Sequence, residues 1–178
     1  MDDRTISLDP RSPRRERTFA LRPVADELTA LADRVGATAL RKVAFEGRLT
    51  PTGTADWRLD ARLGATAVQP CVVTLAPVTT RIETDVVRHY VDGYEMPDDG
   101  GEFEMPEDET TEPRPATLDL GEVLAEALSL ALPDFPRADG AELGQAVYAE
   151  PGTAAMTDDD AKPLAGLRGL LGKDDGTD

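Results

Sequence analysis

The first regular pattern along the chain predicts an amphipathic helix between Pro23 and Gly36. Apolar residues recur there at helical spacing, as in Leu28, Leu31 and Val35. This spacing places them on one face of a helix. Proline suits the first turn of a helix and glycine suits its end, so both boundary residues agree with the prediction.

From residue 43 the pattern changes to period two. Apolar and polar residues alternate over 43–49 and, after a break at 50–53 that contains Pro and Gly, again over 57–67. Residues 71–75 form a short run of β-prone residues, and alternation returns over 78–86. Alternation is typical of strands with one buried face, and short breaks favour hairpins. We therefore expect an antiparallel β-meander or a partly closed barrel.

Helical spacing returns after Asp119, a residue type that caps helix N-termini, with Glu122 three positions later as in a capping box. The apolar face continues to Ala131, and Pro133 follows as a stop signal. The expected fold is therefore α+β, with the strands packed against two main amphipathic helices.

A length of 178 residues fits one domain of ordinary size. Residues 92–112 contain ten Asp and Glu and no Lys or Arg, a composition typical of a mobile loop. We expect one domain over residues 1–156, with an acidic mobile loop at 92–116. Residues 157–178 are expected to form a flexible acidic tail with a short apolar docking segment.

The formal net charge is -16, so the chain as a whole repels phosphate backbones and acidic membrane surfaces. No apolar run follows the N-terminal arginines, and no stretch approaches the roughly 20 apolar residues that span a bilayer. The lone cysteine, Cys71, excludes an internal disulfide and suits a reducing compartment. We expect a cytoplasmic protein that does not bind membranes.

The groups that catalysis and metal binding require are sparse. The only histidine, His89, lies in a strand-like run, so no triad can draw on a second histidine. The acidic segment lacks the ligand spacing of an EF-hand. Cys71 has no histidine near it in sequence and is followed by valines, which favours a buried small apolar residue over a nucleophile. We expect no catalytic residue, no metal and no cofactor.

Arginines are the one group suited to RNA contact. The candidates are four residues near the N-terminus and two on the polar face of the strand at 57–67, namely Arg11, Arg14, Arg15, Arg17, Arg58 and Arg62. The alternative is that the N-terminal arginines offset the acidic surface, while the strand arginines pair across the sheet with residues such as Glu83 and Asp85. We favour the alternative, because solvated faces laced with ion pairs are usual.

Three stretches, in this order along the chain, resemble the YceD family of large ribosomal RNA subunit accumulation proteins, in its alphaproteobacterial form. They are VQPCVVTLAPV at 68–78, LDLGEVLAEALSLALPDFP at 118–136 and PLAGLRGLL at 163–171. The residues that carry the match are Cys71, Leu75, Pro77, Val78, Asp119, Leu120, Leu132 and Pro133. Many members of the family have a second cysteine where this chain has Thr74, and a single thiolate cannot form a closed tetrahedral zinc site.

The resemblance implies a ribosome-biogenesis protein that supports accumulation or processing of large-subunit (23S) ribosomal RNA without catalytic residues. Three mechanisms are open. The favoured one is binding to a ribosomal protein or assembly factor of the large subunit, with the acidic loop supplying attraction. The second is direct RNA binding through the six arginines. The third is an unrecognised metal-dependent enzyme that holds magnesium through carboxylates. The sequence leaves the partner and the oligomeric state open.

Overall fold

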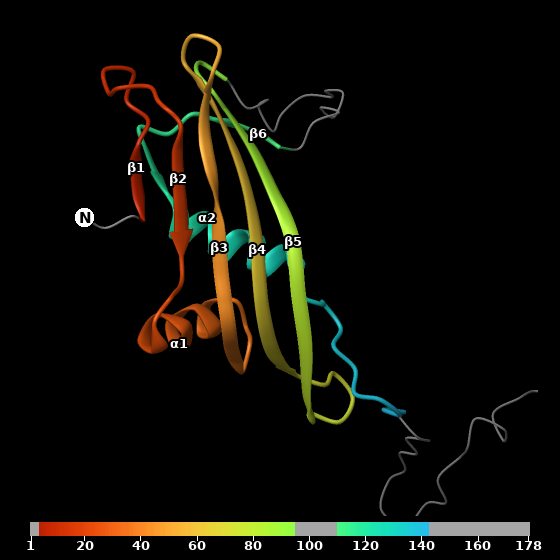
Figure 1. Cartoon of the computed structure of the whole chain (residues 1–178). Coiled ribbons are helices and arrows are strands. Elements are labelled where there is room, and N and C mark those ends of the chain that lie inside the picture. Colours follow the sequence, from red (N-terminus) through yellow and green to blue (C-terminus); the bar gives the residue numbers. More distant parts are fainter. Residues whose placement is uncertain (1–3, 95–109, 143–178) are drawn as a thin grey trace, which may run out of the picture. The chain divides into compact units, whose positions relative to one another are not determined.

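Three long strands form the centre of the fold in the computed structural model. A short strand flanks them on each side, and the order across the sheet is β2-β3-β4-β5-β6 (Figure 1). Strands β2 to β5 are antiparallel neighbours, and β6 pairs with β5 in parallel. The bounds are β2 (Arg17–Leu21), β3 (Ala39–Thr52), β4 (Asp56–Pro70), β5 (Pro77–Val91) and β6 (Thr111–Pro113).

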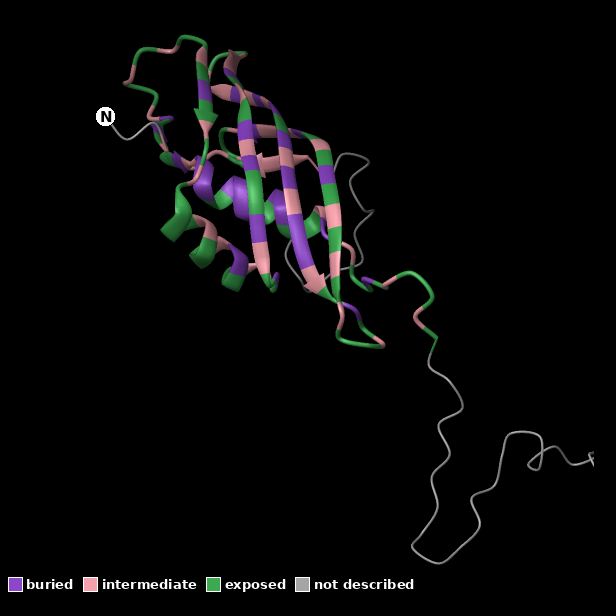
Figure 2. Cartoon of the chain, turned by 60° about the horizontal axis from the view of Figure 1, so that its bottom comes forward, coloured by how far each residue is buried: buried purple, intermediate pink, exposed green. Residues whose placement is uncertain are grey.

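The period-two pattern decides which face of the sheet is buried. In β4, Trp57, Leu59 and Leu63 are buried, while Arg58 and Arg62 lie on the opposite face. The helix α2 (Leu120–Ala131) lies behind the buried face, and the front face has no helix over it in the described residues (Figure 1). Burial alternates along each long strand in the same way (Figure 2). The core therefore lies between the sheet and α2, and the front face is called the open face below.

Both helices begin where a carboxylate satisfies free backbone N–H groups. The Asp119 side chain accepts hydrogen bonds from the backbone N–H groups of Gly121, at 2.7 Å, and Glu122. In α1 (Ala25–Arg34), the Glu27 side chain accepts from the backbone N–H of Val24 at 2.9 Å. These contacts replace hydrogen bonds that the first turn of a helix cannot make internally.

Two points on β3 restrict the backbone. The register with β4 shifts between Arg41 and Ala44, where Lys42 has a φ of 50°. This is a β-bulge with a non-glycine residue in the left-handed region, which bends the strand locally. Further along, a Cβ atom at Gly47 would lie 2.3 Å from the carbonyl oxygen of Asp60, so only glycine fits this close approach.

A second, two-stranded sheet joins the N-terminus to the start of α2. It consists of β1 (Thr5–Ser7) and β7 (Thr117–Asp119), which are antiparallel. The buried residues Ile6 and Leu118 face each other in this pair and belong to the common core. The sequence pattern did not predict β1, β2, β6 or β7, because strands of three to five residues are too short to show a period.

The α+β prediction is confirmed, including both helices and the antiparallel meander. The sheet is open, because its edge strands β2 and β6 are not paired with each other in the described part of the chain, so the barrel alternative does not apply. The β-prone run at 71–75 forms a turn between β4 and β5 and not a strand. The backbone N–H of Cys71 donates to the carbonyl of Ala76 at 2.7 Å, and that of Leu75 to the carbonyl of Cys71 at 2.9 Å, which closes a turn.

The structure describes residues 4–94 and 110–142. Contacts divide the chain into one unit at 1–139 and a second at 140–178. The expected domain boundary at 156, and the tail that follows it, lie outside the described residues and stay predictions. Most of the expected loop at 92–116 also lies outside them, and its described part contains β6.

Candidate functional site

The open face of the sheet carries the two strand arginines, and both are paired with carboxylates. Arg58 donates to Asp60 on the same strand at 2.9 Å, and this bond lowers the pKa of Asp60. Arg62 reaches Glu83 on β5 at 3.3 Å, and Glu83 also accepts from Arg81 at 3.0 Å. Hydrogen bonds from Arg81 and then the charge of Arg62 lower the pKa of Glu83. The cross-strand partner expected for Arg62 is therefore present, whereas Arg58 pairs along its own strand.

Arg14 has a structural role in the β3–β4 hairpin. Its guanidinium donates to the carbonyl oxygens of Thr52 at 2.9 Å and Asp56 at 2.6 Å, and to those of Gly53 and Thr54 between them. It also lies over the ring of Trp57, with 5.6 Å between the guanidinium carbon and the ring centroid. One side chain thus closes the hairpin between β3 and β4 through backbone acceptors, and it is not available to a phosphate.

The other N-terminal arginines, Arg11, Arg15 and Arg17, do not lie together with Arg58 and Arg62. Arg11 and Arg15 are exposed in the connection between β1 and β2. Arg17 lies opposite Leu49, which is on the buried face, and its buried Nε has no hydrogen-bond partner among the described residues. Arg58 and Arg62 lie on the open face, so the structure does not gather the six candidate arginines into one cationic patch.

The negative charge of the chain is concentrated outside the described domain. Residues 4–94 and 110–142 contain 16 Lys and Arg and 18 Asp and Glu, which is close to neutral. Most of the formal charge of -16 therefore belongs to the rest of the chain, and the segment at 95–109 alone contains eight Asp and Glu.

Two arginines hold the ends of the acidic segment at 92–112. Arg88 on β5 bonds Glu112 at 2.7 Å and Glu126 on α2 at 3.0 Å, and its side chain is only 14% exposed. Arg114 bonds Asp92 and donates to the carbonyl of Leu8 at 2.6 Å. The segment therefore leaves and rejoins the sheet at one place, beside the parallel pairing of β5 with β6.

The cluster around Arg88 is partly desolvated. Burial raises the pKa of Glu112, and the positive charge of Arg88 opposes this rise. Burial likewise raises the pKa of Tyr90, whose hydroxyl is buried without a hydrogen-bond partner among the described atoms. The sequence interpretation missed Arg88 and Arg114. The sequence did contain a signal for Arg88, because it lies between Val86 and Tyr90 on the apolar side of β5. A cation on a buried face requires anionic or polar partners.

Cys71 lies fully buried at the turn between β4 and β5. Its Sγ accepts hydrogen bonds from the backbone N–H groups of Ala138 at 3.3 Å and Val73 at 3.4 Å. A hydrogen bond from the side chain of Thr74 and these backbone donors lower the pKa of Cys71 to about 6, although burial acts in the opposite direction. Val72 also donates to the carbonyl of Pro136 at 2.9 Å, so this turn holds the segment that follows α2.

No metal fits this turn. The groups that contact the thiol are the Thr74 hydroxyl and backbone N–H donors, which do not bind cations, and no group of three or more His, Cys, Asp or Glu within residues 4–94 and 110–142 is suited to hold an ion. His89 is half-buried on β5, opposite Arg58. Catalysis by converging side chains therefore finds no support in the described part of the chain.

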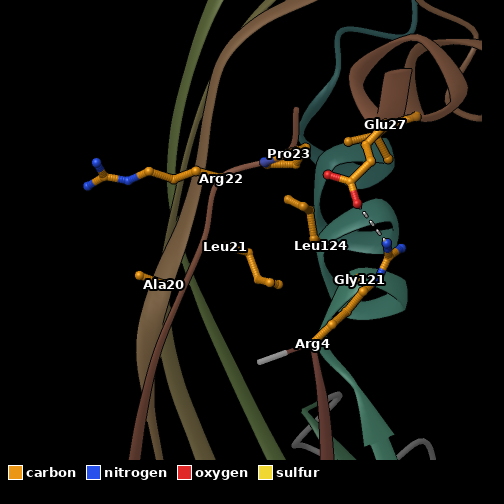
Figure 3. Close-up of a pocket in the computed structure, with 9 residues that line it drawn as sticks. Arg4, Ala20, Leu21, Arg22, Pro23, Glu27, Gly121 and Leu124 are labelled. Atoms are coloured by element: carbon orange, nitrogen blue, oxygen red, sulfur yellow. Dashed lines mark hydrogen bonds and ion pairs between the residues drawn. The ribbon is translucent and has the colours of Figure 1, made fainter. Parts of the chain in front are cut away.

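A pocket of about 220 Å³ lies between the end of β2 and the N-terminal half of α2 (Figure 3). Arg4 lies along α2 against Gly121 and reaches Glu27 and Asp119, each at 3.5 Å. Leu21 and Leu124 both lie in the space between β2 and α2, whereas Arg22 points away from it (Figure 3). The positive charge of Arg4 is thus balanced by Glu27 and Asp119, and none of the residues that line the pocket is a nucleophile.

Comparison with known proteins bears directly on this arrangement. A family model described as "Large ribosomal RNA subunit accumulation protein YceD" matches residues 59–171, which is more than half of the chain. The chain belongs to the YceD family. No curated protein and no solved structure matches it.

The match to the YceD family begins within β4 and includes β5, α2 and the Cys71 turn, while α1, β2 and β3 precede it. Its motif residues lie in three places. Cys71, Leu75, Pro77 and Val78 lie at the turn into β5, Asp119 and Leu120 begin α2, and Leu132 and Pro133 follow its end. The Gln69 side chain donates to the carbonyl of Pro133 at 3.3 Å, so the first and last of these groups are adjacent. In the described residues, no helix of this YceD protein is long and apolar enough to cross a membrane.

Proposed function

We propose that this YceD protein supports the accumulation of large-subunit ribosomal RNA without catalysis, by binding a basic ribosomal protein or assembly factor of the large subunit. Family membership supports the ribosomal process. We place this function in the cytoplasm, where a lone thiol such as Cys71 stays reduced.

The observation that carries the choice of partner is the separation of charge along the chain. A domain close to neutral carries an acidic segment whose two ends are fixed by Arg88 and Arg114. A concentrated negative segment attracts basic proteins, speeds their association and repels RNA. Ribosomal proteins freed of RNA are partners of the matching charge.

The contacts of the arginines count against direct RNA binding. Arg58 and Arg62 would have to leave Asp60 and Glu83 to meet phosphates, and Arg14 would have to release the β3–β4 hairpin. Among the described residues, the open face also carries no Phe, Tyr or Trp on which single-stranded bases could stack.

The test uses the full chain as bait for protein extracted from large ribosomal subunits and treated with ribonuclease. The acidic variant changes the eight Asp and Glu of residues 95–109 to Asn and Gln and keeps Asp92 and Glu112. A control variant makes the same change at the seven Asp and Glu of residues 143–178. We expect ribosomal proteins to bind the wild type, with binding weakened about tenfold or more in the acidic variant and changed little in the control.

A second control replaces Arg58 and Arg62 by glutamine. Direct RNA binding predicts the opposite set of results, in which ribonuclease removes the bound material and the arginine variant loses affinity for ribosomal RNA. That outcome, with an unaffected acidic variant, would refute the proposed function.

A further inference from the structure

Strand β5 has a long edge that is free of neighbouring strands within the described residues. It runs over the 15 residues Pro77–Val91, but β6 pairs only with His89, Tyr90 and Val91. From Val78 to Arg88 the side of β5 away from β4 has no strand beside it in the described part of the chain (Figure 1). Natural sheets usually keep such edges short or cover them, because unpaired backbone groups bind other strands.

The pairing with β6 shows which backbone groups of β5 point to this edge. His89 donates to the carbonyl of Thr110 at 2.8 Å, and Val91 accepts from Arg114 at 3.0 Å, so these residues direct their backbone groups away from β4. The register with β4 is continuous along all of β5. Because direction alternates along a strand, the same holds for every second residue before His89. These residues are Thr79, Arg81, Glu83, Asp85 and Val87.

The opposite edge of the sheet is protected, which makes the β5 edge distinct. There the bulge at Lys42 distorts β3, β2 covers residues 45–49, and α1 packs against β3. Bulges and covering elements are the usual protection of sheet edges. Strand β5 has neither feature between Val78 and Arg88 in the described residues.

A groove lined by both apolar and polar side chains lies beside the free edge on the side of the sheet that faces α2. A groove of about 320 Å³ runs between β5 and the second half of α2. Val86 contributes from β5, and Ala127, Leu130 and Ala131 contribute from α2. Leu130 is 75% exposed at this groove, so its side chain offers apolar surface to a neighbouring chain.

The charges on the open face of this edge favour a basic neighbour. Arg81 and Glu83 are paired with each other and Glu83 also with Arg62, so these side chains are balanced. Asp85 is exposed and has no ion-pair partner in the described part of the chain. An added strand would therefore place a Lys or Arg beside Asp85.

From these features we infer that β5 binds an extended segment of a basic protein as an additional strand. Small apolar side chains of that segment would pack on Ala127, Leu130 and Ala131, and the basic side chains that alternate with them would face Asp85. Backbone hydrogen bonds to Thr79, Arg81, Glu83, Asp85 and Val87 would supply affinity, and the two faces would supply specificity. This inference rests on the proposed function, because it names how the ribosomal or assembly protein is held.

The first experiment compares hydrogen exchange of β5 amides with and without the ribonuclease-treated proteins of the large subunit. In the free protein the amides of Thr79, Arg81, Glu83, Asp85 and Val87 should exchange quickly, and those of the residues between them slowly. Bound protein should slow exchange at these five positions. Fast exchange at all five in the bound state would overturn the inference.

The second experiment measures binding of the same proteins to matched variants of the full chain. Val87→Pro removes an outward N–H without breaking the ladder to β4, and Val87→Ala keeps it. We expect Val87→Pro to bind about tenfold or more weakly than Val87→Ala, because a hydrogen bond is lost and the ring blocks the approaching strand. Leu130→Asp should weaken binding, whereas Val24→Asp, at a comparably exposed apolar residue on the other side of the fold, should not.

The outcomes separate the two proposals. If wild type binds ribosomal proteins and both Val87→Pro and Leu130→Asp bind them equally well, the edge inference fails and the proposed function stands. If wild type binds no ribosomal protein after ribonuclease treatment, the proposed function fails and the inference falls with it. A dimer of the free protein that Val87→Pro abolishes would show that a second copy occupies the edge, which also overturns the stated partner.

Discussion

Arg88 offers a measurable test of how the acidic segment is fixed to the domain. Its side chain is 14% exposed and lies between Glu112, which is 38% exposed, and Glu126, which is 54% exposed. Replacement by methionine keeps the apolar stem but leaves two carboxylates close together without a cation. Breaking a buried ion pair costs about 3 to 5 kcal/mol, and the partial exposure of both carboxylates reduces this, so we expect Arg88→Met to lower the free energy of unfolding by about 2 kcal/mol.

Urea denaturation at pH 7, followed by far-ultraviolet circular dichroism, measures this loss directly. The double variant Arg88→Met/Glu112→Gln should recover about half of it, because the uncompensated carboxylate is then neutral. Arg62→Met provides the matched control on the same sheet. Its pair with Glu83 is exposed, so the change should stay within about 0.5 kcal/mol. If Arg88→Met costs no more than Arg62→Met, the desolvated cluster does not stabilise the fold and the reasoning is refuted.

The pH dependence follows from the raised pKa of Glu112. A carboxyl group with a raised pKa in the folded state opposes folding when ionised, and protonation relieves this as the pH falls through that pKa. The deficit of Arg88→Met should therefore shrink between neutral pH and the acid range. A deficit that grows as the pH falls would contradict this assignment.

Three further predictions concern other parts of the domain. Gly47→Ala should lower the free energy of unfolding by about 3 kcal/mol in urea titrations, because the added Cβ would collide with the backbone of Asp60. A loss of stability no larger than that of Ala44→Gly would contradict the close approach. Asp119→Ala should cost about 1 kcal/mol in the same assay through loss of the α2 cap, while Asp119→Asn should retain most of the stability. The thiolate of Cys71 should appear in ultraviolet absorbance with a pKa of about 6. Its ionisation then adds stability as the pH rises from about 6 toward the pKa of the unfolded thiol, so the advantage of wild type over Cys71→Ser should fall as the pH drops. A midpoint at or above the ordinary thiol pKa would count against the hydrogen bonds at Sγ.

The sequence predicted the elements whose length allows a pattern to repeat. Trp57, Leu59 and Leu63 on β4 give a clear period of two, and the cap residue Asp119 marks the start of α2. The run at 71–75 contains β-prone residues such as Val72 and Val73, yet these residues lie in a turn. What decides their conformation is the turn's own hydrogen bonds, including those to the Cys71 sulfur, and propensity does not report such contacts.

The candidate site was harder to predict because its contacts are distant in sequence. Arg14 meets the hairpin around Gly53, Arg114 meets Asp92 and Leu8, and Arg88 meets Glu126. Arginine composition gave a list of candidates, but which arginines serve the fold depends on pairing between strands. The free edge of β5 likewise depends on the shortness of β6, which no periodic pattern indicated.

The parallel direction of β6 has a consequence for how this protein can vary. Two neighbouring parallel strands cannot be joined by a tight turn, so the connection at 92–110 must be long enough to return beside the strand that it left. Once that length is met, loop-closure entropy rises only slowly with further length, by about 0.6 kcal/mol for each doubling. The length of this connection, and with it the number of carboxylates that it carries, can therefore change with little effect on the stability of the sheet, so attraction to the proposed basic partner can vary without a change of fold.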